Sequence, residues 1–252
     1  KKTRNGVIWM KLSIILCTYE SWEVTDRQMK YFKAMNLPDD IEFILVDDGS
    51  NPPHPQYDLK NLTVHYTNDK RPWTQGLARN AGVNLAKGEY ILCTDIDHIL
   101  SKEAIMASYE FTGDKMIFPR FLAVLDENGV LHQDFETLLE YGMPPDRTTS
   151  KRGLYASYHG NTYVIPREVF IMLGGNPVKA CTYGHHAVSK KGEDSYFATR
   201  WNHWALKNNK TAVAGPPIYM FPIGRYNVNY DLNPKGLFHT LSYSPTVQPN
   251  KK

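Results

Sequence analysis

Residues 91–98 read ILCTDIDH, an apolar run that ends in two aspartates separated by a single residue. Residues 44–50 read ILVDDGS and have the same form, an apolar run that ends in acids. Such runs are typical of buried strands in an α/β sheet, whose carboxyl ends open into a ligand crevice. In an extended segment Asp95 and Asp97 would point to the same side, where two carboxylates can hold a divalent cation and the phosphates that it neutralises.

A third acidic stretch, KGEDSYFATRW at 191–201, supplies Glu193 and Asp194 far along the chain from the first two. A carboxylate from a separate segment is free to act as a base, so the three stretches together predict a metal site with a base beside it. The simpler interpretation of Glu193 and Asp194 is the solvated first turn of a helix, where acids suit the helix dipole.

The first two stretches also have simpler interpretations. Asp, Gly and Ser form turns, so residues 47–50 could be only the junction between a strand and a turn. Asp95 and Asp97 could cap a helix ahead of Ser101, although capping does not require two acids after a buried strand. The occurrence of both stretches in one chain favours the ligand crevice over either alternative.

Length and composition are those of an ordinary globular protein, with 252 residues, 42% apolar and 22% charged. The net charge is only +3 and no stripe of Lys and Arg stands out, so we expect no nucleic-acid partner. No run approaches the ~18 apolar residues of a membrane span, and no signal-peptide pattern precedes Met10. We therefore expect a cytoplasmic protein without a transmembrane segment, and we treat residues 1–9 as an extension outside the fold.

The three cysteines are Cys17, Cys93 and Cys181. Their odd number and the lack of a CxxC spacing argue against a disulfide framework or a zinc site. Cys17 and Cys93 fall inside predicted buried strands, where cysteine behaves as a small apolar residue. A reducing compartment fits this pattern best.

The first part of the chain alternates predicted strands and helices. Their order is strand 12–17, helix 22–36, strand 41–46, strand 62–66, helix 74–86 and strand 90–94. Thr74 is placed to cap the second helix, and Gly88 is placed to end it. This order predicts an α/β fold with a mostly parallel sheet and right-handed crossovers.

The second part is less regular. It contains predicted helix 101–111, hairpin strands 115–126 and 130–133, strand 162–165, and helices 166–173 and 193–206. The connection 174–192 has a length that is usually functional or mobile. The expected division is a single domain at 10–214, with two halves at 10–100 and 101–214, followed by a tail rich in Pro and aromatic residues at 215–252.

These stretches, in this order, resemble the inverting GT-A glycosyltransferases of family 2. The matching segments are SIILCTYE (13–20), IEFILVDDGS (41–50), GLARNAGVNLAKGEYILCTDIDHIL (76–100) and GEDSYFATRW (192–201). The segment GNTYVIPREVFIMLGG (160–175), followed by Gly192-Glu193-Asp194, also resembles the C-terminal half of galactosyl- and polypeptide N-acetylgalactosaminyl-transferases. The resemblance implies a Rossmann-like GT-A fold, with helices around a mostly parallel central sheet and a smaller mixed region on the acceptor side.

The resemblance also implies a donor site. Family members bind a nucleotide-diphosphate sugar, most often a UDP-sugar, over the carboxyl edge of the sheet. Thr18, Tyr19 and Glu20 match the loop that meets the nucleoside. Asp48 matches the acid that contacts the base or the ribose, and Arg79 matches an arginine near the nucleotide, although it could also only pair with an acid.

The DxD motif of the family matches Asp95-Ile96-Asp97. In this pattern Asp95, next to Ile96, faces the ribose or the donor sugar, while Asp97, with Asp95 beside it, binds Mn²⁺ or Mg²⁺. Asp194 matches the general base of the Glu-Asp pair and Glu193 the member that orients the acceptor. The implied reaction is one in-line displacement that inverts the anomeric carbon while the metal stabilises the leaving diphosphate.

The third protein ligand of the metal is open. Many family members have Asp where His98 stands, and related enzymes carry a metal-binding His in a region that here reads IYMFPIGRYN (218–227) without His. The metal could be held by Asp97 and the diphosphate alone. Alternatively, His98, His186 or His239 could complete the site.

Two other functions compete with this one. A sugar-nucleotide pyrophosphorylase would need a Gly-rich, Arg-containing loop after the first strand, where this chain has CTYE at 17–20. A non-catalytic binder of nucleotides or carbohydrates would not need Glu193 and Asp194, but fold alone does not establish function. The donor sugar is open, and the acceptor is open between a glycan, a lipid-linked sugar, a protein and a small molecule.

Overall fold

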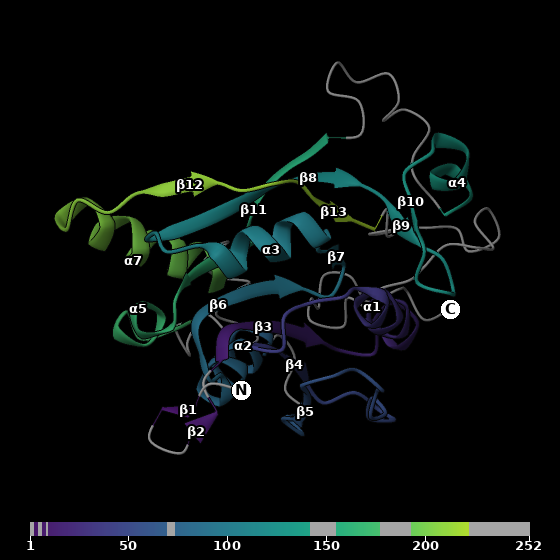
Figure 1. Cartoon of the computed structure of the whole chain (residues 1–252), viewed down its shortest axis with the longest axis horizontal. Helices are drawn as coiled ribbons and strands as arrows, with labels where there is room; N and C mark the ends of the chain where they lie inside the picture. The colour runs from purple at the N-terminus through teal and green to yellow at the C-terminus, as the bar shows by residue number, and fades with distance from the viewer. Residues whose placement is uncertain are drawn as a thin grey trace, which may run out of the picture.

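A mixed sheet of nine strands forms the centre of the protein, with helices on both of its faces (Figure 1). The computed structural model describes residues 3–4, 7–8, 10–69, 74–141, 155–176 and 193–221. All statements about the fold and the site below concern these residues.

Four parallel strands form the first half of the sheet. They are β3 (Met10–Thr18), β4 (Ile41–Asp47), β5 (Leu62–Tyr66) and β6 (Gly88–Asp95). The crossovers contain helices α1 (Trp22–Ala34) and α2 (Gln75–Leu85). Strand β3 lies between β4 and β6, which places Thr18 beside Asp47 and Cys17 beside Asp95.

The second half of the sheet is mixed. It contains β7 (His98–Ile99), β8 (Lys115–Leu122), β11 (Tyr155–Pro166), β12 (Ala212–Ala214) and β13 (Ile218–Met220). Strand β11 runs antiparallel between β6 and β8, while β12 and β13 pair in parallel with β8. The order across the sheet is β5-β4-β3-β6-β11-β8-β13-β7, with β12 beside β8. The predicted α/β fold, mostly parallel in its first half and mixed in its second, is confirmed.

Shorter elements complete the fold. The short strands are β1 (Thr3–Arg4), β2 (Val7–Ile8), β9 (Val124–Leu125) and β10 (Leu131–His132). The remaining helices are α3 (Lys102–Glu110), α4 (Phe135–Glu140), α5 (Arg167–Met172) and α7 (Glu193–Lys207). Ser101 caps α3 as predicted, because its hydroxyl accepts a hydrogen bond from the backbone N–H of Ala104 at 3.0 Å.

Two hydrophobic cores cover the two faces of the sheet, because successive residues of β3 point to opposite sides. Leu12, Ile14 and Leu16 join residues of α1 and α3 in the larger core. Ile15 and Cys17 join residues of α2, α5 and α7 in the other core. The strands are apolar on both faces because both faces are covered.

The predicted hairpin of strands 115–126 and 130–133 is wrong for residues 115–122, which form β8. Only β9 and β10 pair as a hairpin, with Leu131 beside Leu125, while β8 joins the large sheet instead. The reason is that β8 is apolar on both faces: Met116 belongs to the larger core and Ile117 packs against the other. A strand with two apolar faces is stabilised inside a covered sheet and not at its surface.

Strand β13 lies within the segment that the sequence assigned to a tail. It pairs with β8 on one side and with β7 on the other. Its first residue, Ile218, belongs to the larger core. Three residues are too few to show a strand period, so the sequence carries no local signal for this element.

Cys17 and Cys93 are free and buried, as predicted. Burial raises the pKa of the Cys93 thiol to about 11, which keeps it protonated and unreactive near neutral pH. Cys181 lies outside the described residues. Among the helices that the structure describes, none combines the length and the apolar character that crossing a membrane requires.

Gly82 allows helix α2 to lie directly against β3 and β4. A Cβ atom on this residue would lie 2.6 Å from Cγ2 of Ile15 and 3.1 Å from Cγ2 of Val46. We expect Gly82→Val to lower the free energy of unfolding by about 1–3 kcal/mol, because overpacking forces buried side chains off their rotamers. Asn84→Val, at an exposed position of the same helix, is the control. Urea denaturation that gives equal stabilities for the two variants would contradict the close approach.

Candidate active site

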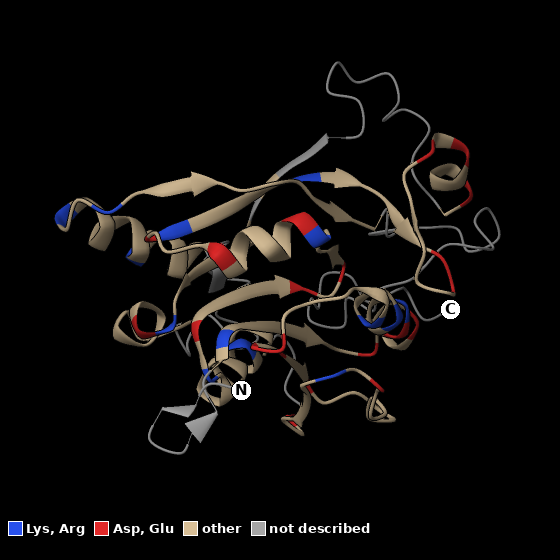
Figure 2. Ribbon diagram, in the orientation of Figure 1, with Lys and Arg blue, Asp and Glu red and all other residues tan. Residues whose placement is uncertain are grey.

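The carboxyl ends of β3, β4 and β6 meet at one edge of the sheet. The register places Asp47 beside Thr18 and Asp95 beside Cys17, so the acids that end β4 and β6 flank the loop that follows β3. Figure 2 shows acidic residues where β6 ends. This is the edge at which α/β sheets bind ligands.

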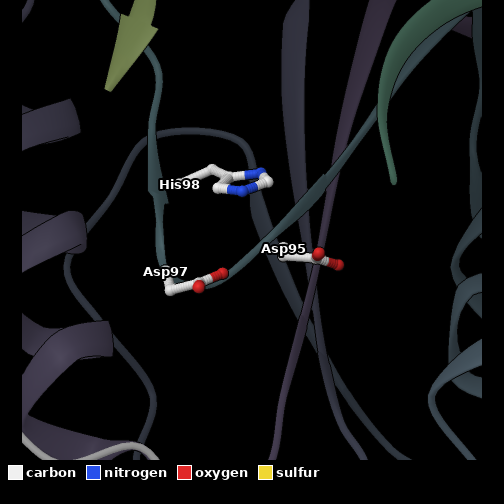
Figure 3. A group of neighbouring side chains, drawn as sticks. All are labelled: Asp95, Asp97 and His98. Carbon is white, nitrogen blue, oxygen red and sulfur yellow. The ribbon is translucent and has the colours of Figure 1, made fainter. Parts of the chain in front are cut away.

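Asp95, Asp97 and His98 form a compact group at the end of β6 (Figure 3). One ligand atom of each residue lies within 4.8 Å of the others, and all three residues are buried. Figure 3 shows the carboxylate of Asp97 pointing toward Asp95. The extended geometry expected for residues 95–97 is wrong, because residues 96 and 97 form a turn. The two carboxylates come together through this turn.

Three side chains from two other elements hold Asp95. From α2, Nε2 of Gln75 and Nη2 of Arg79 each donate a hydrogen bond to Oδ1 at 2.9 Å. From β11, Nδ2 of Asn161 donates to Oδ2 at 3.0 Å. The ion pair is buried, with 1% of the Arg79 side chain and 11% of the Asp95 side chain exposed. These donors fix the orientation of the carboxylate.

His98 uses both of its ring nitrogens within the protein. Nη1 of Arg120 donates to Nε2 of His98 at 2.8 Å, so Nε2 accepts and carries no proton. The proton is therefore on Nδ1, which donates to Oγ1 of Thr162 at 2.6 Å. The imidazole is neutral, and it can bind a metal only if Arg120 or Thr162 gives up its bond.

The chemistry of this group fits a hard divalent cation. Carboxylate oxygens are the ligands that Mg²⁺ and Mn²⁺ prefer. Asp97 and Asp95 supply them from adjacent, buried positions, and the neutral ring of His98 would have to rearrange before it could join them. The other candidate ligands lie outside the described residues; they are His185, His186 and His239.

The loop after β3 is held by contacts from two other segments. Oγ1 of Thr18 lies 3.0 Å from Oγ1 of Thr25 on α1 and 3.2 Å from Nε2 of His54. The backbone N–H of Glu20 donates to Oγ of Ser50 at 2.9 Å. Glu20 has a φ of +43°, a conformation that is uncommon outside glycine and that needs support from its surroundings.

Asp47 shapes the loop that follows β4. Its Oδ1 accepts a hydrogen bond from the backbone N–H of Ser50 at 2.9 Å, and its Oδ2 accepts one from the backbone N–H of His54 at 2.7 Å. Burial lowers the pKa of His54, so the ring is neutral near neutral pH. The first acid of the Asp47-Asp48 pair therefore holds the loop in place.

Asp48 is buried between two threonines. Oγ1 of Thr74 donates to Oδ2 of Asp48 at 2.8 Å, and Oγ1 of Thr67 donates to Oδ1 at 3.2 Å. Burial raises the pKa of Asp48 from 3.8 to about 7, and the two hydroxyl bonds oppose this rise. The predicted capping of α2 by Thr74 is wrong at the level of the side chain, which makes no capping bond, because its hydroxyl donates to Asp48.

Ile96 and Tyr19 are the two further residues of the predicted donor site. The side chain of Ile96 belongs to the larger core, with 2% exposed, and its carbonyl accepts a hydrogen bond from Gln28. Tyr19 is half-buried, and its carbonyl accepts a hydrogen bond from the hydroxyl of Ser21 at 2.8 Å.

The predicted base and its neighbour lie at the start of helix α7. The helix begins at Glu193, so Glu193 and Asp194 occupy its first turn. Their side chains lie outside the described part of the structure. The helix itself is anchored farther on, where Phe197 stacks on Tyr163 of β11 with ring centroids 5.5 Å apart.

Helices α2 and α7 both hold residues at the start of the predicted connection 174–192. Nδ2 of Asn80 donates to the carbonyl of Asn176 at 3.0 Å, and the N–H of Asn176 donates to Oδ1 of Asn80 at 2.8 Å. Arg200 of α7 donates to the carbonyl of Gly175. The two predicted halves of the domain are linked here through Asn80, the residue that follows Arg79.

Several residues of this site carry no motif in the sequence. They are Gln75, Arg120, Asn161 and Thr162, together with Thr67 beside Asp48; the sequence predicts Thr74 only as a helix cap. Gln75 lies four residues before Arg79 and therefore on the same face of α2, which is the one local signal available. The others contact the site from separate segments.

The comparison with protein families gives a match over more than half of the chain. Residues 13–171 match the model described as glycosyl transferase family 2. This stretch begins in β3, ends in α5 and contains the whole group of residues around Asp95, from Thr18 to Asn161.

Known proteins resemble this chain over part of their length. The poly(ribitol-phosphate) beta-glucosyltransferase of Bacillus spizizenii is 30% identical over 112 residues, which are 41% of this chain and 17% of that protein. The mannosyltransferase PcManGT of Pyrobaculum calidifontis, in complex with GDP-Man and Mn²⁺, has a TM-score of 0.50 at 17% identity and covers 84% of this chain and 57% of its own. TarS 1–349 of S. aureus, in complex with UDP-GlcNAc, has a TM-score of 0.51 at 20% identity, and the match covers 88% of this chain and 61% of that fragment. The chain thus spans less than two thirds of each of these proteins.

The raised pKa of Asp48 predicts a stability that falls with pH. Between about pH 4 and 7 the folded protein keeps the proton that the unfolded chain releases, so the folded state binds more protons and loses stability as the pH rises. Asp48→Asn removes this titration. We expect the variant to gain stability over the wild type across this range by up to a few kcal/mol, at about 1.4 kcal/mol per unit of pKa.

Urea unfolding of the wild type and of Asp48→Asn at several pH values measures this difference. A difference that stays constant from about pH 4 to 8 would show that the carboxyl titrates alike in the folded and unfolded chains.

Proposed function

This chain belongs to glycosyl transferase family 2, and we propose that it is an inverting glycosyltransferase that moves a sugar from a UDP-sugar to a hydroxyl group of an acceptor. The observation that carries the proposal is the buried pair of Asp95 and Asp97 at the carboxyl edge of the sheet. Two carboxylates this close together are a ligand set that a divalent cation can bind. Arg79 pairs with Asp95, and a cation at this edge would be held by Asp97 with Asp95 beside it.

The nucleotide is proposed to bind between the loop after β3 and the loop after β4. Thr18, Tyr19 and Glu20 would meet the nucleoside, and Asp48 would contact its base or ribose. UDP is favoured because the similar fold of TarS is in complex with UDP-GlcNAc. GDP is the alternative, since the similar mannosyltransferase is in complex with GDP-Man. Arg79 would act near the nucleotide through the carboxylate of Asp95 that it orients.

Asp97, with Asp95 beside it, is proposed to hold Mn²⁺ or Mg²⁺. When bound, such an ion supplies positive charge against the diphosphate leaving group. Gln75, Arg79 and Asn161 donate hydrogen bonds that hold the carboxylate of Asp95 in place. His239 remains the proposed further ligand, and His98 is held by Arg120 and Thr162.

Asp194 is proposed as the general base and Glu193 as the residue that orients the acceptor. The acceptor oxygen attacks the anomeric carbon while Asp194 takes its proton, and the bond from that carbon to the diphosphate oxygen breaks, which inverts the configuration. The assignment rests on the match of Glu193 and Asp194 to the Glu-Asp pair of the family, and both residues begin helix α7. The proposed likeness of residues 160–175 and 192–194 to galactosyl- and N-acetylgalactosaminyl-transferases would agree with it.

The proposed division of the chain follows from these assignments. Residues 10–100 would bind the donor, and residues 101–214 would receive the acceptor. Strand β11 joins the two halves, because it pairs with β6 on one side and with β8 on the other.

Two substitutions separate donor binding from transfer. Asp97→Ala is expected to abolish metal-dependent binding of UDP, because it removes the proposed cation ligand. Asp194→Asn is expected to leave UDP binding unchanged and to lower transfer by a factor of about 10²–10⁴, because the amide cannot accept the proton. Calorimetry with UDP in the presence and absence of Mn²⁺ measures the first, and release of UDP from the donor measures the second.

A thermal-shift screen of UDP, GDP, CMP and dTDP, each with and without Mn²⁺, identifies the nucleotide beforehand. Loss of UDP binding in Asp194→Asn would contradict its role as a base. A wild-type protein that binds none of the four nucleotides would be a non-catalytic member of the family.

A further inference from the structure

Helix α1 contacts the turn that carries Asp97 through the side chain of Gln28. Nε2 of Gln28 lies 2.7 Å from the carbonyl oxygen of His98 and 3.1 Å from that of Ile96. An amide nitrogen carries two hydrogens, so it donates one to each carbonyl. Gln28 therefore holds the backbone on both sides of Asp97.

The carbonyl of Asp97 itself is bonded to another distant segment. The backbone N–H of Phe221 donates to it at 3.0 Å, and the preceding residue, Met220, is paired with His98 between β13 and β7. All three carbonyls of the turn 96–98 are thereby bonded to residues far away in the sequence. These bonds fix the path of the backbone at Asp97, and with it the direction of its side chain.

The burial of Gln28 is not explained by packing. Its side chain is fully buried, and its Oε1 has no hydrogen-bond partner within the described ranges of the chain. A buried amide oxygen without a partner is unfavourable, so the two bonds that Nε2 makes have to offset this cost. A Met at this position of α1 would remove the donor from the carbonyls of Ile96 and His98, so what Gln28 supplies here is its contact with the turn.

We infer that Gln28 is a positioning residue for the cation site, because it holds the 96–98 turn so that the carboxylate of Asp97 faces Asp95. The inference rests on the proposed function, since it takes the two aspartates as the cation site. Gln28 acts only through the backbone of the turn. Loss of a supporting contact of this kind typically weakens metal binding by ~10–100-fold.

The test compares the wild type with Gln28→Met and Gln28→Asn. Met has the same length without a donor, and Asn keeps the amide but is one methylene too short to reach both carbonyls. Titration with Mn²⁺, with and without UDP, is followed by electron paramagnetic resonance of the free ion. We expect Mn²⁺ binding to weaken by ~10–100-fold in both variants, with metal-free UDP binding unchanged. Hydrogen exchange of the Phe221 amide is expected to accelerate, because its acceptor lies in the loosened turn.

Thr25→Val is the matched control. Thr25 lies on the same helix and is also fully buried, but its hydroxyl contacts Thr18 and not the turn. In the titration without UDP, this variant is expected to keep the wild-type affinity for Mn²⁺, and it is expected to keep the wild-type exchange rate at Phe221 even where its melting temperature falls. The titration with UDP is not used for this control, because Thr25 contacts Thr18 of the proposed nucleotide site.

The outcomes separate the inference from the proposed function. Wild-type Mn²⁺ affinity and slow exchange at Phe221 in both Gln28 variants would overturn the inference and leave the proposed function intact. Equal weakening in Thr25→Val would also overturn it, because a general loss of stability would then account for the effect. Failure of the wild type to bind Mn²⁺, alone or with UDP, would overturn the proposed function.

Discussion

The buried ion pair between Arg79 and Asp95 is the interaction on which the rest of the site depends. An ion pair out of water is stable only when its geometry is good and the remaining hydrogen-bonding positions are filled. Here the charged atoms are 2.9 Å apart, and Gln75 and Asn161 supply further bonds to the carboxylate. Because the four residues come from α2, β6 and β11, the pair also fixes these elements at the edge where the chain turns toward Asp97.

The surrounding contacts come from both ends of the described chain. Helix α1 covers one face of the sheet with apolar residues, and it also presents Thr25 to the loop after β3 and Gln28 to the turn 96–98. Phe221 reaches the same turn from the end of β13. The elements that build the core are therefore the elements that orient the acids, so the geometry of the site is inseparable from the packing beneath it.

Local patterns in the sequence predict the strands and the positions of the acids at their ends. A strand ends where its apolar run ends, so the pattern of residues alone places Asp48 and Asp95 at the correct edge of the sheet. Contacts between distant segments have no such pattern. Gln28 lies 68 residues from Ile96, and no rule of spacing connects them. At Thr74 a local pattern gives the wrong result. The residue stands where a helix cap is expected, but its hydroxyl donates to Asp48 instead.

Because Asp48 can gain or lose a proton near neutral pH, ligand binding at this edge of the sheet depends on pH. Its pKa of about 7 leaves the carboxyl partly protonated at neutral pH. A ligand that donates a hydrogen bond to the carboxylate stabilises its charged form and expels a fraction of a proton. The buffer takes up that proton with its own heat of ionisation. The enthalpy of ligand binding at this site is then a property of the protein, the ligand and the buffer together, and it would differ between phosphate and Tris at the same pH.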